Sequence, residues 1–342
     1  MGTVHIDGSF GEGGGQVLRT GLTLAAITGR GLHIDNIRAN RPKPGLGKQH
    51  LACVEAACKI CNAGCSGDKI GSTKLDFTPG GVAAGNYNFV IGSAGSASLV
   101  IQTVLPVLFF ADKPSTVTVT GGTHNPWAPP FDFLKESYLP GIAGMGFKAD
   151  CKLLRFGFYP AGGGEIVFKV QPKRTDEGNP PDLCEPMAGP KISAKIYTSR
   201  LPVQIAQKQH KLLLDTGLDF EAIENINVTD SVSAGNCVVV RITDKKRTIV
   251  FTGFGSRGKP SEKVINEVVT QARDFLNSGA AIDSHLADQL LIYMAMQRAG
   301  KFTTNRLSKH LTTNMEVIKK FLPVSFVVEK EHDYYRVLCT GL

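Results

Sequence analysis

The sequence predicts an α/β (α+β) protein made of three similar units, with a small α/β module inserted between the second and the third. One observation is an internal repeat: loops of glycine or other small residues at 11–16, 92–96 and 279–284 each open an apolar helix. Another is that a strand-like stretch, a polar loop and a second helix follow each time. Units of this composition pack as sheets with helices covering one face.

The first unit starts with the strand VHID, followed by the glycine-rich loop and a helix over 17–29. A strand-like stretch at 31–40 and a polar, basic loop at 41–48 come next. The apolar spacing then predicts a second helix over 49–61.

The second unit has a helix predicted over 97–111 and a strand at 115–123, where β-branched residues alternate clearly in STVTVT. The loop HNPWAPP separates this strand from a second helix over 131–146. In the third unit the predicted order is a helix over 285–300, a strand-like stretch at 301–310, a short Thr-Thr turn and a helix over 314–322.

The amino-acid composition of the chain changes between the second and third units. Residues 173–190 are rich in Pro, Asp, Glu and Gly and are predicted to be a linker. A strand at 191–200, a helix at 202–217 and three further strands follow, which fits an inserted domain of about a hundred residues. The predicted helix at 261–277 could belong either to this inserted domain or to the third unit. The predicted division is 1–183 for the first two units, 184–276 for the module and 277–342 for the third unit.

The net charge of +8 and the pI near 9.0 suit a polyanionic partner, although many basic proteins have none. The longest apolar run, 99–111, is interrupted by Gln102 and Thr103 and predicts a buried helix, so we expect no membrane partner. The N-terminus has no basic-then-apolar signal segment. We therefore expect a cytoplasmic protein with reduced thiols.

The spacing of Cys53, Cys58, Cys61 and Cys65 is close to the start of a plant-type iron–sulfur pattern. Residues 51–62 also have helical apolar spacing, with Leu51, Val54, Ala57, Cys58 and Cys61 on one face of a helix. We favour the buried cysteines, because such spacing matches often arise by accident.

Two glycine-rich loops are candidates for phosphate binding. GEGGGQ follows a strand and opens a helix, so its backbone N–H groups could face an anion, although it lacks the Lys-Ser/Thr of a P-loop. A tight turn would explain the glycines but would require neither Glu12 nor Arg19. The second loop, GFGSRGKP at 253–260, nearly matches a P-loop, but Pro260 stands where a hydroxyl should hold Mg²⁺. We favour a turn without a nucleotide there.

A basic loop at 38–50 contains Arg38, Arg41, Lys43 and Lys48, is stiffened by two prolines and leads into a helix. Stiff loops preset phosphate-binding groups, and Arg binds phosphate with two parallel hydrogen bonds. A solvated basic turn explains the pattern equally well. None of the eight histidines forms a pair with zinc-ligand spacing, and spacing alone does not single out His310.

The chain contains the segments EGGGQVLR, RPKPGLGKQH, IGSAGSASLVIQTVLP, GGTHNPWAPP, GFYPAGGGE, HLADQL and SKHLTTN. By these segments it resembles the RNA 3′-terminal phosphate cyclase family over nearly its whole length. The resemblance implies three repeats of a four-stranded sheet with two helices, plus a smaller inserted domain.

The resemblance also implies a function. In this family a histidine attacks the α-phosphorus of ATP, and the AMP then passes to an RNA 3′-phosphate. The neighbouring 2′-hydroxyl closes a 2′,3′-cyclic phosphate and expels AMP. His310 in SKHLTTN matches the family nucleophile. A neutral imidazole is nucleophilic, and the charge on the phosphates calls for cations and for Mg²⁺ or Mn²⁺.

Other roles follow from the same resemblance. Glu12 matches a glutamate near the metal and the ATP, and Arg19, Arg38 and Arg41 match arginines that face phosphates. Residues expected to contact the adenosine are Gln102, Pro129, His285, Leu286, Ala287, Asp288 and Gln289. Residues expected at the RNA terminal phosphate are Lys43, Gln49 and His50. His285 departs from the family, whose members tend to have tyrosine there, so nucleotide affinity or preference is open.

Two rival functions remain. One is a non-catalytic cyclase-like binding protein of ribosome assembly, whose members lack the histidine that this chain has at 310. The other is an enolpyruvyl transferase, which has a related repeat fold but not GFYPAGGGE or SKHLTTN. Fold similarity alone could not separate these functions. The physiological RNA, the role of the inserted module, the preferred metal and the oligomeric state, a homodimer included, stay open.

Overall fold

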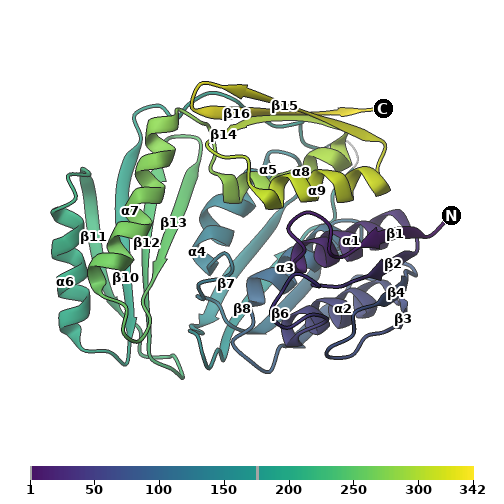
Figure 1. Cartoon of the computed structure of the whole chain (residues 1–342), viewed down its shortest axis with the longest axis horizontal. Coiled ribbons are helices and arrows are strands. Elements are labelled where there is room, and N and C mark those ends of the chain that lie inside the picture. Colours follow the sequence, from purple (N-terminus) through teal and green to yellow (C-terminus); the bar gives the residue numbers. More distant parts are fainter. Residues whose placement is uncertain (1, 175–176) are drawn as a thin grey trace.

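The computed structural model describes residues 2–174 and 177–342 and contains four four-stranded sheets. Figure 1 shows the sheets and helices of the three units at one side and an inserted module at the other. This architecture confirms the predicted class of repeated four-stranded α+β units with a small inserted α/β domain. No helix in the described part of the chain combines the length and the apolar character needed to cross a membrane.

The three repeated units share one topology. In each sheet the first two strands are parallel, and the spatial order is first, second, fourth, third. The first unit contains β1 (Val4–Asp7), α1 (Gly15–Thr28), β2 (Leu32–Asp35), α2 (Lys48–Cys61), β3 (Gly64–Ser66) and β4 (Leu75–Thr78). The second contains β5 (Asn86–Val90), α3 (Ala97–Leu108), β6 (Ser115–Gly121), α4 (Phe131–Phe133), the π-helix η1 (Leu134–Tyr138), α5 (Leu139–Ala143), β7 (Ala149–Arg155) and β8 (Gly164–Val170).

The third unit is split along the chain. It contains β9 (Asp182–Leu183), α8 (Ser284–Gln297), β14 (Ala299–Thr304), α9 (Lys309–Phe321), β15 (Val324–Glu331) and β16 (Tyr334–Gly341). Its first strand, β9, pairs with β14 through Lys301 and Phe302. The interpretation of 173–190 as a linker is therefore wrong for β9, because the third sheet needs this segment as its fourth strand. Residues 175–176 of that interpretation lie outside the described residues.

The inserted module lies between β9 and α8 in the chain. It contains β10 (Lys191–Ser199), α6 (Val203–Leu214), β11 (Phe220–Asn227), β12 (Gly235–Thr243), β13 (Thr248–Phe254) and α7 (Ser261–Ser278). Helix α7 packs on β12, β13 and α6, so its contacts are with the module. The exact domain boundaries at 183/184 and 276/277 stay a prediction.

The start of α9 corrects the predicted third unit. The strand-like stretch was expected to run to residue 310 and the helix to begin at 314, but β14 ends at Thr304 and α9 already begins at Lys309. Ser308 caps the helix, since its hydroxyl accepts the Leu311 N–H at 2.9 Å. Thr312 and Thr313 were predicted to form a turn, but both are helical residues of α9, and Thr313 is buried. His310 therefore lies in the first turn of a helix.

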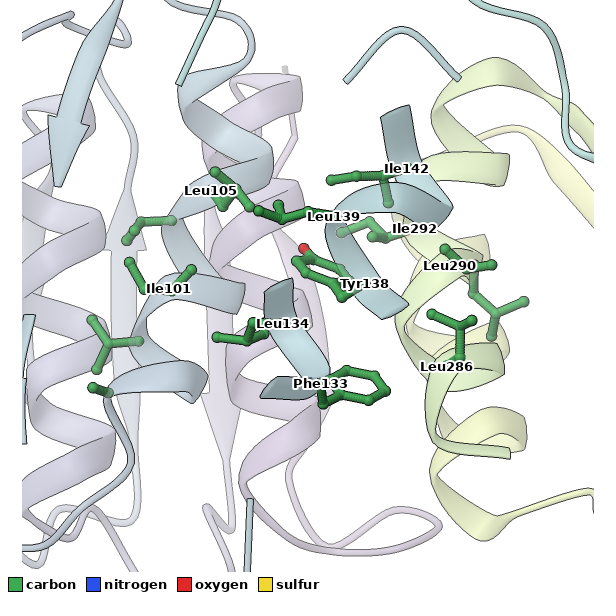
Figure 2. Packing of buried hydrophobic residues seen from close by; sticks show 14 of the residues in the cluster. Ile101, Leu105, Phe133, Leu134, Tyr138, Leu139, Ile142, Leu286, Leu290 and Ile292 are labelled. Carbon is green, nitrogen blue, oxygen red and sulfur yellow. The ribbon is translucent and has the colours of Figure 1, made fainter. Parts of the chain in front are cut away.

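The helices of the three units meet in one core, where α1 packs against α3 and α9, and α8 packs against α9. Figure 2 shows side chains of α3, of the α4–α5 segment and of α8 filling the space between the second and third units. Leu134 and Leu290 are fully buried there. The hydroxyls of Tyr138 and Tyr293, also buried, are 2.5 Å apart and satisfy each other inside this apolar layer.

A buried polar network holds the inserted module against the second unit. Arg241 of β12 donates to Asp132 at 2.6 Å and to Glu136 at 2.5 and 3.1 Å. Asp132 also accepts from Tyr197 at 2.8 Å and lies 2.9 Å from His124. The side chains of Arg241 and Asp132 are only 8% and 6% exposed. Removing the guanidinium would leave two carboxylates in a poorly solvated place.

We predict that Arg241→Met lowers the free energy of unfolding by about 3 kcal/mol or more, because Asp132 and Glu136 lose their shared cation. Urea denaturation followed by circular dichroism measures the change. Lys191→Met is the control: its partner Glu221 and Lys191 itself are exposed, so we expect a much smaller loss of stability. Equal losses in the two variants would contradict the importance of this network.

Candidate active site

A cleft of about 1070 Å³ is lined by residues from all three units and from the inserted module. Most of the residues predicted from the sequence line it. They are Glu12, Arg19, Arg38, Arg41, Gln49, His50, Pro129, His285, Asp288, Gln289 and His310. The fold thus brings together side chains that lie up to 298 positions apart in the sequence, as between Glu12 and His310.

Four predicted residues do not line this cleft. Gln102 lines a small cavity of about 30 Å³ beside it, which it shares with Arg19, Asp288 and Gln289. Leu286 and Ala287 are buried on the inner face of α8. Lys43 is exposed at the tip of the basic loop. Contact of these side chains with a nucleotide or a phosphate stays a prediction.

The GEGGGQ loop ends at the N-terminus of α1, where Gly14 is the N-cap residue. Gly11 and Gly13 have φ values of 62° and 61°, which glycine adopts without strain. A Cβ atom at position 15 would lie 2.7 Å from an Nη atom of Arg19 and from Nε2 of His50. Only glycine leaves room for these two side chains. Unpaired N–H groups at the start of a helix attract anions.

Glu12 is the acidic centre of the cleft and is held by α9. Its backbone N–H donates to the hydroxyl of Thr313 at 3.0 Å. One carboxylate oxygen forms an ion pair with Arg41. The other, Oε2, is buried without a hydrogen-bond partner and lies 3.8 Å from Nδ1 of His310.

His310 is positioned by a buried carboxyl group behind the helix cap. The hydroxyl of Ser308, the N-cap residue, donates to Asp288 at 2.7 Å. The Asn314 side chain donates to the backbone oxygen of Asp288 at 3.0 Å and accepts from Thr20 at 2.7 Å. Burial raises the pKa of Asp288 to about 8. These bonds connect α8, α9 and α1 at the point where His310 enters the cleft.

The surroundings of His310 favour the neutral imidazole. The side chain is 48% exposed, and its partial burial lowers its pKa to about 4, with further contributions from the positive charges of Arg19 and Arg41 and from His285. A histidine with such a pKa is neutral near pH 7 and retains its nucleophilic lone pair.

His50 and Gln49 also have defined partners. Nδ1 of His50 accepts the Gly47 N–H at 3.2 Å, which leaves Nε2 as the N–H donor of the neutral ring. Burial, followed by the charges of the three nearby arginines, lowers the pKa of His50 to about 3. The amide oxygen of Gln49 accepts the Ser96 N–H at 2.7 Å and so joins the first unit to the N-cap of α3.

The structure adds cleft residues that the sequence analysis did not assign. Lys259, from the near P-loop of the inserted module, lines the cleft and donates to the Phe254 carbonyl at 2.8 Å and to Glu267 at 2.5 Å. The glycine pattern at 253–260 singles out the loop that contains Lys259. It does not indicate that this loop lies close to the other units. Arg306 and Trp127 also line the cleft, and nothing local in the sequence indicates it.

No group of three or more His, Cys, Asp or Glu side chains within 2–174 and 177–342 is arranged to hold a metal ion. Glu12 can supply one carboxylate oxygen, which suits Mg²⁺ bound mainly through substrate phosphates and water. Cys53 and Cys61 are buried in the core on α2, whereas Cys58 and Cys65 are partly buried. Cys65 lies on β3, so the interpretation as buried cysteines of a helix holds for Cys53 and Cys61 only.

Comparisons with known proteins agree with the sequence pattern. The family model described as RNA 3′-terminal phosphate cyclase matches residues 10–328. A protein of Ralstonia nicotianae named RNA 3′-terminal phosphate cyclase is 45% identical over 332 residues, covering 96% of this chain and 94% of the relative. Proteins of the same name from Koribacter versatilis and Ectopseudomonas mendocina are 42% and 41% identical, covering 98% and 96% of this chain and 95% and 96% of the relatives.

We predict that His310 in the free protein titrates well below the ordinary value of 6.5 and that Arg19→Gln raises its pKa, because removing a nearby positive charge favours the imidazolium. Imidazole proton shifts in NMR spectra measure the titration, with His310→Asn to assign the signal. Arg30→Gln, at the far end of α1 where Arg30 contacts the Lys320 carbonyl, should leave the pKa unchanged. A pKa of 6.5 or higher in the unaltered protein would contradict this account.

Proposed function

The chain belongs to the RNA 3′-terminal phosphate cyclase family, and from this membership we propose that it converts an RNA 3′-phosphate into a 2′,3′-cyclic phosphate through a covalent AMP on His310. It is an enzyme of this family. The observation that carries the proposed mechanism is the position of one neutral, partly exposed histidine beside Glu12 and close to Arg19 and Arg41 in the same cleft.

The first proposed step forms a bond between an imidazole nitrogen of His310 and the α-phosphorus of ATP, while the bond to pyrophosphate breaks. Nδ1 of His310 lies on the side of Glu12, 3.8 Å from Oε2, and in the proposed reaction Nδ1 carries the proton and Nε2 presents the lone pair. Negative charge increases on the departing pyrophosphate and on the α-phosphate oxygens. Arg19, Arg38 and the N–H groups at the start of α1 are placed to stabilise that charge.

A divalent cation, when bound, would neutralise part of the phosphate charge and make pyrophosphate a better leaving group. Glu12 fits the role of its protein ligand, because its Oε2 is buried, has no hydrogen-bond partner and faces the cleft. The residues that line the rest of the cleft would then orient the nucleotide. Pro129, His285 and Gln289 lie along the cleft where an adenosine could rest, and His285 offers a smaller ring than tyrosine for stacking.

In the second proposed step an oxygen of the RNA 3′-phosphate attacks the α-phosphorus, and His310 leaves as a neutral imidazole. In the third step the adjacent 2′-hydroxyl attacks the RNA phosphorus, its proton is released, and AMP departs. The N–H of His50 at Nε2 and the guanidinium groups of Arg38 and Arg41 are suited to hold the terminal phosphate during both transfers.

The test is covalent labelling with ATP that carries a radioactive α-phosphate, in the presence of Mg²⁺ or Mn²⁺ and, separately, of EDTA. We expect acid-labile label on the protein, discharged by an oligoribonucleotide with a 3′-phosphate, and no label in EDTA. His310→Ala should remove the label completely, because the nucleophile is missing. His210→Ala, in the inserted module and outside the cleft, is the matched control and should retain it.

Two results would argue against the proposal. Label that persists in His310→Ala would mean that another residue carries the AMP. No label with either metal, in protein whose circular dichroism spectrum shows that it is folded, would favour a binding protein without adenylation activity.

A further inference from the structure

The only tryptophan of the chain, Trp127, lies on the surface at the edge of the cleft. Its side chain is 71% exposed, and it makes an edge-to-face contact with Tyr159, which is 53% exposed. The ring centroids are 5.0 Å apart and the rings are nearly perpendicular at 87°. An exposed pair of large aromatic side chains at the edge of a cleft suits a binding surface, because Trp and Tyr are enriched where proteins contact their partners.

The two loops that present this aromatic pair are tightly fixed. The Thr123 N–H donates to the Gly157 carbonyl at 2.9 Å, and the Gly157 N–H donates back to the Thr123 hydroxyl at 2.9 Å. The Asn125 side chain donates to the Ala94 carbonyl at 3.1 Å and accepts the Trp127 N–H at 3.4 Å. These hydrogen bonds fix the two loops that carry Trp127 and Tyr159. Binding would therefore require little ordering of the loops.

The same loops lead directly to the residues proposed for the terminal phosphate. A Cβ on Gly162, three residues after Tyr159, would lie 2.7 Å from the Ser93 carbonyl oxygen. The segment from Ser93 to Ser96 in turn packs on Gln49, whose amide accepts the Ser96 N–H. His50 and Trp127 line the same cleft, so a strand whose terminal phosphate lies at His50 can extend along the cleft towards the aromatic pair.

The chemistry of this surface matches a single-stranded nucleic acid. Stacking rings next to cations are the combination by which proteins bind unpaired strands without sequence preference, since every base has a flat face. Trp127 shares the cleft with Arg38 and Lys48, which can contact phosphates. A single mononucleotide has only one base, and Pro129 and His285 are already available to the adenine of ATP.

We propose that Trp127 and Tyr159 form a stacking platform for a base next to the 3′-phosphate of the RNA substrate. The platform holds the RNA end so that its phosphate reaches the adenylated histidine. This proposal rests on the function proposed above, since it assigns the substrate's nucleobase to a part of the same cleft.

Tryptophan fluorescence tests the platform directly, because Trp127 is the sole source of the signal. We expect saturable quenching when the protein is titrated with a short single-stranded oligoribonucleotide carrying a 3′-phosphate. The same oligonucleotide with abasic sites at its last two positions should quench much less. Quenching by ATP alone, with no further change on adding RNA, would assign the ring to the nucleotide and overturn the proposal.

Variants separate RNA binding from adenylation. Trp127→Ala and Tyr159→Ala should each weaken RNA binding, measured by fluorescence anisotropy of a dye-labelled oligonucleotide, about tenfold. Formation of AMP-protein from ATP alone should change less than twofold in Tyr159→Ala, because the Tyr159 side chain does not line the cleft. Tyr159→Phe keeps the ring and should bind RNA normally, and Phe110→Ala removes an exposed ring outside the cleft as the control.

These outcomes distinguish the two proposals. If wild type and both alanine variants form AMP-protein and bind RNA equally well, the platform is wrong while the proposed function stands. If no protein variant is adenylated but RNA still quenches Trp127, the platform stands and the proposed function fails.

Discussion

The site depends on the junction between the GEGGGQ loop and the first turns of α9. The Thr313 hydroxyl accepts the Glu12 N–H, and Asn314 bonds to Thr20 of α1 and to the backbone of α8. Gly11 comes so close to Thr313 that a side chain there would collide with it. These contacts join the two ends of the chain and set the imidazole of His310 beside the Glu12 carboxylate.

The electrostatics of the cleft follow from this junction. Partial burial, with the positive charges of Arg19 and Arg41, lowers the pKa of His310 and keeps it neutral, which is the form that can attack a phosphorus atom. The same arginines remain charged and can receive the phosphates of both substrates. Glu12 offsets part of this positive charge through Arg41 and leaves one oxygen free to face the cleft. One set of groups thus provides an unprotonated nucleophile and an anion-binding wall.

The sequence predicted the features that depend on local pattern. Glycine loops followed by apolar helices revealed the repeat, and most of the site residues predicted from the resemblance line the cleft. Features that depend on distant partners were not predictable. Strand β9 is two residues long and exists because β14 pairs with it, and the start of α9 is fixed by Ser308 bonding to the buried Asp288. Trp127 and Lys259 reach the cleft only because separate units meet there.

The most direct test of this account compares two neighbouring threonines of α9. Thr313→Val removes the hydrogen bond to Glu12 and keeps the shape of the side chain, whereas Thr312 bonds only to backbone oxygens of its own helix. The single-turnover rate of AMP-protein formation should fall about tenfold in Thr313→Val, since a displaced nucleophile is costly, and should stay unchanged in Thr312→Val. Equal rates in the two folded variants would contradict the claim that this junction sets the position of His310.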